Sequence, residues 1–379
     1  MNKNRYLEST LTTFLKDRMI FISGPRQVGK STLTLKFLGK QGFKSENYLN
    51  WDDLEDKDKI KKNLLPLSNS ILVFDEIHKY QRWRTFLKGL YDKHKDDIKI
   101  LVTGSARLDH YRKGGDSLFG RYRLLRLHPF TITEINKNPT QSDLSQLLTY
   151  GGFPEPLLKS SPTFHRLWQK ERIERVVKQD IRDLENIREI SLIELLIDAL
   201  PERVGSPLSL RSLQGDLEVS HHSVKKWLDI LDNMFLTYRI SPFGSPKIRA
   251  VKKEQKLYLW DWSQVINPGA RFENLVASHL LKYCHLLEDT QGYKMELRFI
   301  RDTDKREIDF VVLQNKKPLF AVECKSGDKE LSKQINYFKE RTNIPEFYQV
   351  HMKSKDYGDA KKGGRVLPFT KFCQIKALP

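Results

Sequence analysis

Residues 24–31 read Gly24-Pro25-Arg26-Gln27-Val28-Gly29-Lys30-Ser31, which is the spacing G-x-x-x-x-G-K-[ST] of a loop that wraps a phosphate group. A strand-like apolar run precedes the loop at residues 19–22. Thr32 then opens a run to residue 38 with apolar residues at helical spacing. Because strand, glycine-rich loop and helix in this order distinguish a phosphate loop from a chance match, the sequence predicts an ATP-binding site at residues 24–32.

The residues of this loop have separate expected roles. Gly24 and Gly29 allow the backbone to close around a phosphate. Lys30 is expected to reach the β- and γ-phosphates, and the hydroxyl of Ser31 is expected to ligate Mg²⁺. ATP and Mg²⁺ are therefore the predicted cofactors.

A second element of a nucleotide site begins at residue 70. The apolar run 70–74 is typical of a buried parallel strand, and it ends in Asp75-Glu76. Asp75 is expected to hold Mg²⁺ through water, and Glu76 to orient the water that attacks the γ-phosphate. Asp75 follows Lys30 by 45 residues, which leaves room for one further strand and helix between them.

A third apolar run, 98–102, ends in Thr103-Gly104-Ser105. A hydroxyl at the tip of this strand is in position to contact the γ-phosphate and the attacking water. Thr103 and Ser105 are both candidates for this sensor role, and the choice between them stays open. A plain turn at the end of the strand is the alternative.

Four segments together resemble a prokaryotic AAA+ family of ATPases that carries a C-terminal domain of unknown function. They are GPRQVGKS at 24–31, LVFDEIH at 72–78, LVTGSAR at 101–107 and SLFGRYRLLRLHPFTITE at 117–134. The resemblance implies ATP hydrolysis. It also places Arg121 where such ATPases carry an arginine that serves the nucleotide of a neighbouring subunit, which implies a homo-oligomer. The alternative is a surface arginine.

The middle of the chain has a helical pattern at about 160–200, followed by a different one. Residues 208–213 and 221–231 are expected to form two short helices joined by a tight turn, with a strand at 235–240 after them. This order predicts a winged helix. Side chains near the start of its second helix are expected to meet DNA phosphates or base edges: His221, His222, Ser223, Lys225 and Lys226. The alternative is a module that binds protein or covers the ATPase core.

The C-terminal part holds a second set of candidate catalytic residues. Glu273 lies on a predicted helix, Asp309 lies on a strand, and after a polar turn Glu323 and Lys325 share one face of the returning strand. Two carboxylates beside a lysine suit a Mg²⁺-dependent phosphodiesterase. Asp309 and Glu323 are the predicted metal ligands.

The order helix-Glu, strand-Asp, turn, strand Glu-x-Lys resembles the active-site pattern of the PD-(D/E)XK, or restriction-endonuclease-like, fold. The resemblance implies a nuclease site formed by Glu273, Asp309, Glu323 and Lys325. Two alternatives stay open. One is an exposed pair of charges on a hairpin, and the other is a nuclease-like domain whose site only binds.

Composition sets the frame for these sites. The 379 residues suit several domains, and we expect an α/β chain with an ATPase core at 1–150, a helical and winged-helix region at 151–255 and a restriction-endonuclease-like domain at 256–379. The formal net charge of +18 favours DNA as a partner, although a lysine-rich proteome would also produce it. Three scattered cysteines and the lack of a long apolar run predict a cytoplasmic protein without a membrane span.

These observations predict an ATP-hydrolysing protein that processes DNA through a Mg²⁺-dependent nuclease site. The alternative is an ATP-switched regulator that binds DNA or protein through a nuclease-like domain that does not cleave.

Overall fold

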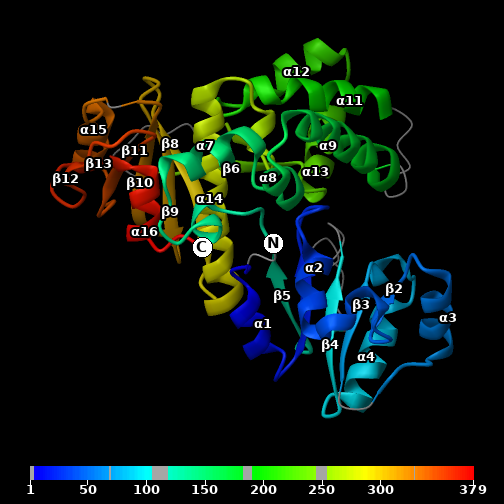
Figure 1. Ribbon diagram of the computed structural model, residues 1–379. Coiled ribbons are helices and arrows are strands. Elements are labelled where there is room, and N and C mark those ends of the chain that lie inside the picture. The colour runs from blue at the N-terminus through cyan, green and yellow to red at the C-terminus, as the bar shows by residue number, and fades with distance from the viewer. Residues whose placement is uncertain (1–3, 68–69, 105–117, 182–189, 245–253, 328) are drawn as a thin grey trace. The chain divides into compact units, whose positions relative to one another are not determined.

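The computed structural model describes residues 4–67, 70–104, 118–181, 190–244, 254–327 and 329–379. The chain divides into two compact units, Met1–His128 and Pro129–Pro379 (Figure 1). The predicted boundaries at residues 150 and 255 stay predictions. Each unit contains one β-sheet.

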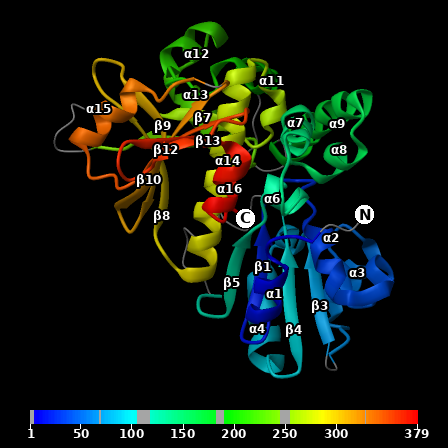
Figure 2. The same cartoon turned by 60° about the vertical axis from the view of Figure 1, so that its left-hand side comes forward.

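The N-terminal unit is built on a parallel sheet of five strands in the order β2-β3-β4-β1-β5. Strands β1, β4 and β3 lie side by side (Figure 2). Every residue of β1 is buried, as expected for a central parallel strand covered on both faces. The elements are α1 (Glu8–Phe14), β1 (Met19–Ser23), α2 (Lys30–Leu35), a 3₁₀ segment (Lys36–Lys44), β2 (Tyr48–Asn50), α3 (Leu54–Lys62), β3 (Ser70–Asp75), a 3₁₀ turn (Ile77–Lys79), α4 (Trp83–His94), β4 (Ile98–Thr103) and β5 (Tyr122–Arg126).

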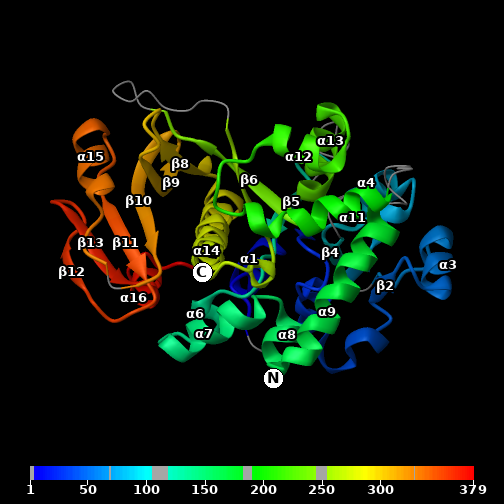
Figure 3. The same ribbon diagram turned by 90° about the horizontal axis from the view of Figure 1, so that it is seen from above.

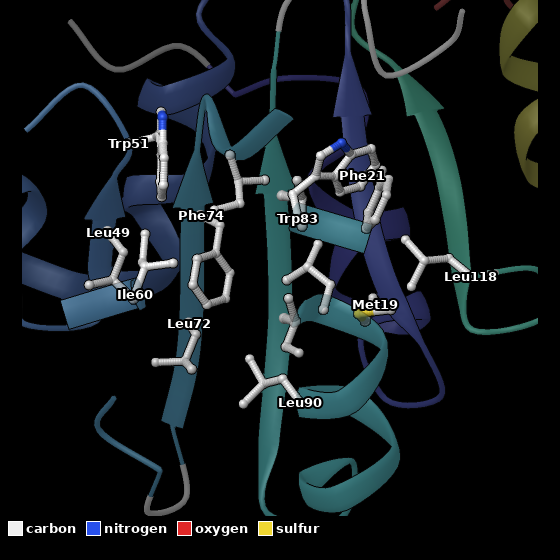
Figure 4. Close-up of a cluster of buried hydrophobic side chains, with 14 of the residues drawn as sticks. Met19, Phe21, Leu49, Trp51, Ile60, Leu72, Phe74, Trp83, Leu90 and Leu118 are labelled. Carbon is white, nitrogen blue, oxygen red and sulfur yellow. The ribbon is translucent and has the colours of Figure 1, made fainter. Parts of the chain in front are cut away.

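A cluster of buried apolar side chains fixes α4 against this sheet (Figure 4). Trp83, Leu87 and Leu90 lie on one side of α4 because they are spaced by three or four residues. They pack with Phe21 of β1 and Phe74 of β3. Each such side chain contributes about 1.5–3 kcal/mol when it is fully buried. The cluster therefore holds β1 and β3 in place, and both strands lead into the predicted nucleotide site.

The C-terminal unit begins with helices and ends in a mixed sheet of eight strands, in the order β12-β13-β11-β10-β9-β8-β6-β7. Figure 3 shows β10, β11 and β13 side by side in this sheet. The helices are α6 (Ile132–Ile135), α7 (Gln141–Tyr150), α8 (Pro154–Lys159), α9 (Pro162–Arg175), a π-helical segment (Val176–Ile181), α11 (Ile190–Ala199), a 3₁₀ turn (Pro201–Arg203), α12 (Leu210–Leu217), α13 (His221–Asn233), a 3₁₀ turn (Trp262–Gln264), α14 (Pro268–Gln291), α15 (Lys333–Arg341) and α16 (Phe369–Ile375). The strands are β6 (Thr237–Pro242), β7 (Lys256–Leu259), β8 (Met295–Arg301), β9 (Glu307–Gln314), β10 (Lys317–Lys325), β11 (Phe347–His351), β12 (Tyr357–Asp359) and β13 (Gly364–Pro368).

The long helix α14 carries Glu273 over this sheet, and its start is well defined. The side chain of Asn267 accepts a hydrogen bond from the backbone N–H of Ala270, and Pro268 occupies the first turn, where its fixed φ suits a helix. The helix contacts β7, β8, β9 and β10. The strands β9 and β10 form the predicted antiparallel hairpin, in which Phe310 pairs with Val322.

The predicted helix-turn-helix corresponds to α12 and α13, and Ser220 caps α13 by accepting the N–H of Ser223. The strand that follows, β6, pairs antiparallel with β7 and parallel with β8. The two-stranded element after the helices thus forms one edge of the large sheet. The winged helix stays a prediction.

Candidate functional site

The loop after β1 has the curvature that a phosphate loop requires. Gly24 has φ 148°, and a Cβ placed there would lie 2.3 Å from the carbonyl oxygen of Leu127, so only glycine fits. The loop ends at Gly29, where α2 begins with Lys30. Of the predicted segment 24–32, residues 24–29 thus form the turn between β1 and α2, and Lys30, Ser31 and Thr32 begin α2.

Lys30 and Ser31 lie at the end of this loop. The buried ammonium of Lys30 donates hydrogen bonds to the carbonyl oxygens of Gly24 (2.9 Å) and Pro25 (2.8 Å). The hydroxyl of Ser31 donates to Oδ2 of Asp75 at 2.7 Å. The structure thus joins two segments that are far apart in the sequence, as predicted.

Asp75 is the centre of the N-terminal site. Its Oδ2 also accepts a hydrogen bond from the hydroxyl of Tyr48 at 2.6 Å, and its Oδ1 accepts one from the hydroxyl of Thr103. Thr103 is the partner of Asp75 in the β3–β4 register. Three hydroxyl groups therefore hold this carboxylate in one orientation.

Sequence reasoning missed Tyr48, which lies on the short strand β2 next to β3. Burial and the neighbouring Asp75 carboxylate raise the pKa of Tyr48 well above its ordinary value, so its hydroxyl stays a hydrogen-bond donor. No local motif points to this tyrosine. Its role depends on the order of the strands in the sheet.

Glu76 follows Asp75 in a left-handed conformation, with φ 54°. Such a conformation is uncommon for a residue other than glycine and concentrates at functional sites. Burial raises the pKa of Glu76, and the ammonium of Lys30 opposes this rise. Its buried Oε2 has no hydrogen-bond partner among the described residues, although Nε2 of His78 lies 3.5 Å away. The carboxylate is therefore in a position to accept a hydrogen bond from water.

The residues present fit a magnesium nucleotide. A hydroxyl and a carboxylate oxygen in contact, from Ser31 and Asp75, are the hard oxygen ligands that Mg²⁺ prefers. Lys30 supplies a positive charge at the end of the same loop, and this charge opposes the rise in the pKa of Glu76. The set can bind a phosphate chain and position a water beside it.

The sequence also predicted Ser105 and Arg121 for this site. Ser105 lies outside the described residues. Arg121 forms a two-pronged ion pair with Asp92, with distances of 2.6 Å from Nε and 3.0 Å from a terminal nitrogen. The hydrogen bonds from Arg121 lower the pKa of the Asp92 carboxyl. Arg121 thus lies on the surface of its own unit, and its role in a neighbouring subunit stays a prediction.

The four predicted C-terminal residues meet around the β9–β10 hairpin. Glu273 comes from α14, Asp309 from β9, and Glu323 with Lys325 from β10. Nζ of Lys325 lies 2.5 Å from Oε1 of Glu323, so the two side chains share a face as the spacing predicted. Oδ2 of Asp309 accepts the backbone N–H of Cys324 at 2.8 Å.

Mutual repulsion marks these carboxylates as one cluster. Burial and the Asp309 charge raise the pKa of Glu323 to about 8, and the Glu273 charge adds to the rise. Burial and the Asp309 charge also raise the pKa of Glu273 to about 7. Oε2 of Glu323 is buried and has no hydrogen-bond partner among the described residues.

Sequence reasoning missed Lys256 and Tyr258 on β7. The fully buried ammonium of Lys256 lies 3.2 Å from Oε1 of Glu273 and 3.5 Å from Oδ1 of Asp309, and it also contacts Glu307. The hydroxyl of Tyr258 donates to Oε1 of Glu273 at 2.7 Å. Alternation along β7 directs both side chains to the same face, but no motif in the sequence connects them to the acids.

A buried lysine lies among the acids of the predicted metal site. Lys256 contacts Glu273 and Asp309, and Asp309 is one of the two predicted metal ligands. Across the described ranges, no group of three or more His, Cys, Asp or Glu side chains is placed to hold a metal ion. A metal held by the two carboxylates of Asp309 and Glu323 stays a prediction.

The surface of α13 is basic at its start. His221, His222, Lys225 and Lys226 are exposed, and Ser223 is half-buried. Val224, Trp227 and Leu228 face the interior. The helix thus presents its polar side to solvent, as a helix that contacts DNA must.

Among the helices in the part of the chain that the structure describes, none has both the length and the apolar character needed to cross a membrane.

Family comparisons divide the chain into three segments. Residues 16–136 match a family described as an AAA domain. Residues 141–266 and 268–372 match two domains of unknown function, DUF8612 and DUF4143. Only the first of these descriptions carries a functional class.

Similar proteins share most of the chain. An uncharacterized protein of Haemophilus influenzae is 26% identical over 352 residues, which cover 82% of this chain and 83% of that protein. An uncharacterized protein of Methanocaldococcus jannaschii is 22% identical over 390 residues, which cover 94% of this chain and 85% of that protein. Their names give no activity.

Two solved structures show a weak likeness. The ORC1 protein of Aeropyrum pernix in complex with DNA has a TM-score of 0.33 and 14% identity, and covers 72% of this chain and 93% of that chain. The RuvB Holliday junction branch migration motor of Thermotoga maritima has a TM-score of 0.31 and 16% identity, and covers 62% of this chain and 88% of that chain. TM-scores this low carry no argument about function.

The phosphate loop, the Asp75 centre and the family match agree with one another. Together they support a P-loop AAA-type ATPase domain at the N-terminus of the chain.

Proposed function

We propose that the chain hydrolyses ATP in its N-terminal unit and uses nucleotide binding to switch its hold on DNA. The observation that carries the first part is the contact of Ser31, Thr103 and Tyr48 with the single carboxylate Asp75. This arrangement connects the phosphate loop with the ends of three strands. A change at the loop is thus transmitted directly to the strand tips.

Each side chain of this site has a defined task. Lys30 binds the β- and γ-phosphates and neutralises their charge. Ser31 and Asp75 hold Mg²⁺, which supplies charge neutralisation at the phosphates when it is bound. Glu76 accepts a hydrogen bond from the attacking water and orients it. Thr103 is the proposed sensor because its hydroxyl contacts Asp75.

DNA is the proposed partner because of charge. The chain carries a net charge of +18, and the start of α13 exposes Lys225 and Lys226 beside two histidines. Neutralising phosphates releases counterions and drives non-specific binding. A winged helix formed by α12, α13, β6 and β7 is the proposed DNA-binding module. The same surface binds a protein partner in the alternative.

The proposal that the chain forms a homo-oligomer rests on Arg121 alone. In a ring or filament this arginine would serve the nucleotide of the neighbouring subunit and stabilise the charge of the transferred phosphoryl group. To do so it must leave its ion pair with Asp92. Hydrolysis that depends on protein concentration, and that Arg121→Ala abolishes, would support this role.

For the C-terminal cluster we favour a nuclease-like domain that binds without cleaving. The contact of Lys256 with Glu273, Glu307 and Asp309 favours this function, because these acids already have a buried ammonium group as their counter-ion.

The second candidate function is a Mg²⁺-dependent nuclease. One observation favours it: Oε2 of Glu323 is buried without a hydrogen-bond partner in the described chain, and Lys325 lies beside the same carboxylate. A Glu-x-Lys pair of this kind can bind a metal and a water. The two functions differ in whether DNA stays intact.

The test compares Lys30→Ala and Glu323→Ala in the full-length chain. ATP hydrolysis, DNA affinity with and without ATP, and the integrity of single- and double-stranded DNA are measured with Mg²⁺ or Mn²⁺. The proposed switch requires that DNA affinity depends on ATP, that Lys30→Ala removes this dependence, and that DNA stays intact throughout. Cleavage that Glu323→Ala abolishes while ATP hydrolysis continues would establish the nuclease instead.

The role of α13 is tested by the salt dependence of DNA binding. Replacing Lys225 and Lys226 by alanine is expected to lower the slope of log affinity against log salt by about 2. The matched control replaces Lys61 and Lys62, two exposed lysines of α3, and removes the same charge. An equal effect in both variants would assign DNA binding to net charge rather than to α13.

A further inference from the structure

We propose that Lys256 is the built-in cation of the C-terminal carboxylate cluster and that it excludes a divalent cation from Glu273 and Asp309. This inference rests on the proposed function in one respect, namely that the cluster does not act by metal chemistry. It concerns a residue that the predicted nuclease pattern does not include.

The backbone holds Lys256 in place. Lys256 pairs with Ile240 of β6 on one side and forms a bridge with Pro207 on the other. Its side chain is fully buried, and Nζ lies 5.6 Å from the centre of the Phe299 ring. The ammonium is therefore enclosed by protein, unlike that of Lys325, whose side chain is partly exposed.

The carboxylate oxygens around Lys256 are already used. Oε1 of Glu273 accepts hydrogen bonds from both Lys256 and Tyr258. Oδ1 of Asp309 faces Lys256 at 3.5 Å, and Oδ2 accepts the N–H of Cys324. A protein site for Mg²⁺ typically offers one or two carboxylates with free oxygens, whereas Oε1 of Glu273 and Oδ2 of Asp309 already accept hydrogen bonds.

The other side of Glu273 is closed by backbone. A Cβ on Gly205 would lie 3.0 Å from Oε2 and 3.1 Å from Oε1 of Glu273. The loop is fixed there because the N–H of Leu208 donates to the carbonyl oxygen of Gln255 at 2.8 Å. Glu273 cannot rotate toward this side to make room for an ion.

The acids of the cluster already have protein cations beside them. Glu273, Glu307, Asp309 and Glu323 are opposed by Lys256, Arg301 and Lys325. A divalent ion bound to Glu273 and Asp309 has metal–oxygen bonds of about 2 Å. It would lie within a few ångströms of Nζ of Lys256, where like charges repel strongly in a buried site.

The experiment measures Mn²⁺ binding by electron paramagnetic resonance on the full-length chain without nucleotide or DNA. All proteins carry Asp75→Asn, which removes a ligand of the other expected metal site. We expect no bound Mn²⁺ in this background and about one bound Mn²⁺ per chain after Lys256→Gln. Because neither ATP nor DNA is present, failure of the proposed switch would leave this result unaffected.

The matched control is Arg301→Gln, which also removes one positive charge but contacts only Glu307. It is expected to bind no Mn²⁺. The proposal is overturned if the background protein binds Mn²⁺ and Asp309→Asn abolishes this binding, or if folded Lys256→Gln binds no more than the background.

If the Lys256→Gln variant does not fold, a second measurement on the Asp75→Asn chain tests the proposal instead. A ligand that binds the folded state raises the unfolding temperature. Mn²⁺ is expected to leave the unfolding temperature of the Asp75→Asn chain unchanged. A rise that Asp309→Asn removes would overturn the proposal.

Discussion

Both candidate sites contain acidic side chains from β-strands, but they differ in what their lysines contact. In the N-terminal site, the ammonium of Lys30 donates to the backbone carbonyl oxygens of its own loop, and Asp75 is held by neutral hydroxyl groups. In the C-terminal site, the ammonium of Lys256 lies directly against the acids. The hydrogen bonds of Lys30 described above go to neutral oxygens, whereas Lys256 contacts carboxylates. Similar residue types therefore support opposite expectations about ligands.

The largest expected effect comes from Lys30→Ala. Loss of the phosphate-binding ammonium removes both nucleotide affinity and charge stabilisation during hydrolysis, so kcat/KM for ATP is expected to fall by about 1,000-fold. Phosphate release measures it. Lys62→Ala, at an exposed lysine of α3, serves as the control. A similar fall in kcat/KM for Lys62→Ala, or full activity of Lys30→Ala, would show that Lys30 does not bind the phosphates as proposed.

Glu76→Gln separates catalysis from binding in the same site. The amide cannot accept a proton or orient water as the carboxylate does, so kcat is expected to fall by about 100-fold. Affinity for ATP is expected to stay near that of the wild type, because Glu76 does not hold the phosphates. Equilibrium binding of a fluorescent nucleotide and phosphate release give the two values. An equal loss of affinity for ATP would show that Glu76 holds the phosphate loop in its binding conformation rather than orienting the attacking water.

The pH dependence of stability tests the C-terminal side of the comparison. Because burial and the Asp309 charge raise the pKa of Glu323 to about 8, the folded chain binds more protons than the unfolded chain between the ordinary glutamate range and pH 8. The free energy of unfolding therefore falls as pH rises through this window. We expect a loss on the order of 2 kcal/mol between pH 6 and pH 9.

Glu323→Gln is the matched variant for this measurement, because a neutral amide replaces the titrating group. Its thermal unfolding is expected to depend less on pH than that of the wild type. Equal slopes for the two proteins would show that Glu323 is ionised throughout, and that Lys256 and Lys325 compensate it fully.

The smallest effect is expected for Tyr48→Phe. The change removes one of the hydroxyl groups on Asp75, but Ser31 and Thr103 keep their contacts. A net loss of about 1 kcal/mol in the free energy of unfolding is expected, with ATP hydrolysis reduced less than about tenfold. Tyr91→Phe is the control, because its hydroxyl donates to a carbonyl on an exposed surface. A much larger loss of activity would make Tyr48 an essential part of the site.

The sequence predicted the residues whose roles follow from spacing along one segment. The phosphate loop, the Asp75-Glu76 pair and the Glu323-x-Lys325 pair are local patterns, and the structure places each of them at a strand end or in a turn. Strand alternation was sufficient to predict that Glu323 and Lys325 share a face. The order of these patterns along the chain also predicted which acids gather in the C-terminal part.

Tyr48 and Lys256 could not be predicted in this way. Tyr48 reaches Asp75 because β2 lies beside β3, and Lys256 comes near Asp309 where α14 packs against both β7 and β9. Both contacts depend on how distant segments pack, and spacing in the sequence does not record it. The prediction of a metal at Asp309 and Glu323 took Lys325 into account but not Lys256, which contacts Asp309.

The position of β7 has a consequence for how the chain can be divided into separate segments. Lys256 and Tyr258 lie in the segment that matches DUF8612, whereas Glu273, Asp309 and Glu323 lie in the segment that matches DUF4143. The counter-ion and its acids thus belong to different modules. A fragment that carried the last segment alone would leave these acids without Lys256.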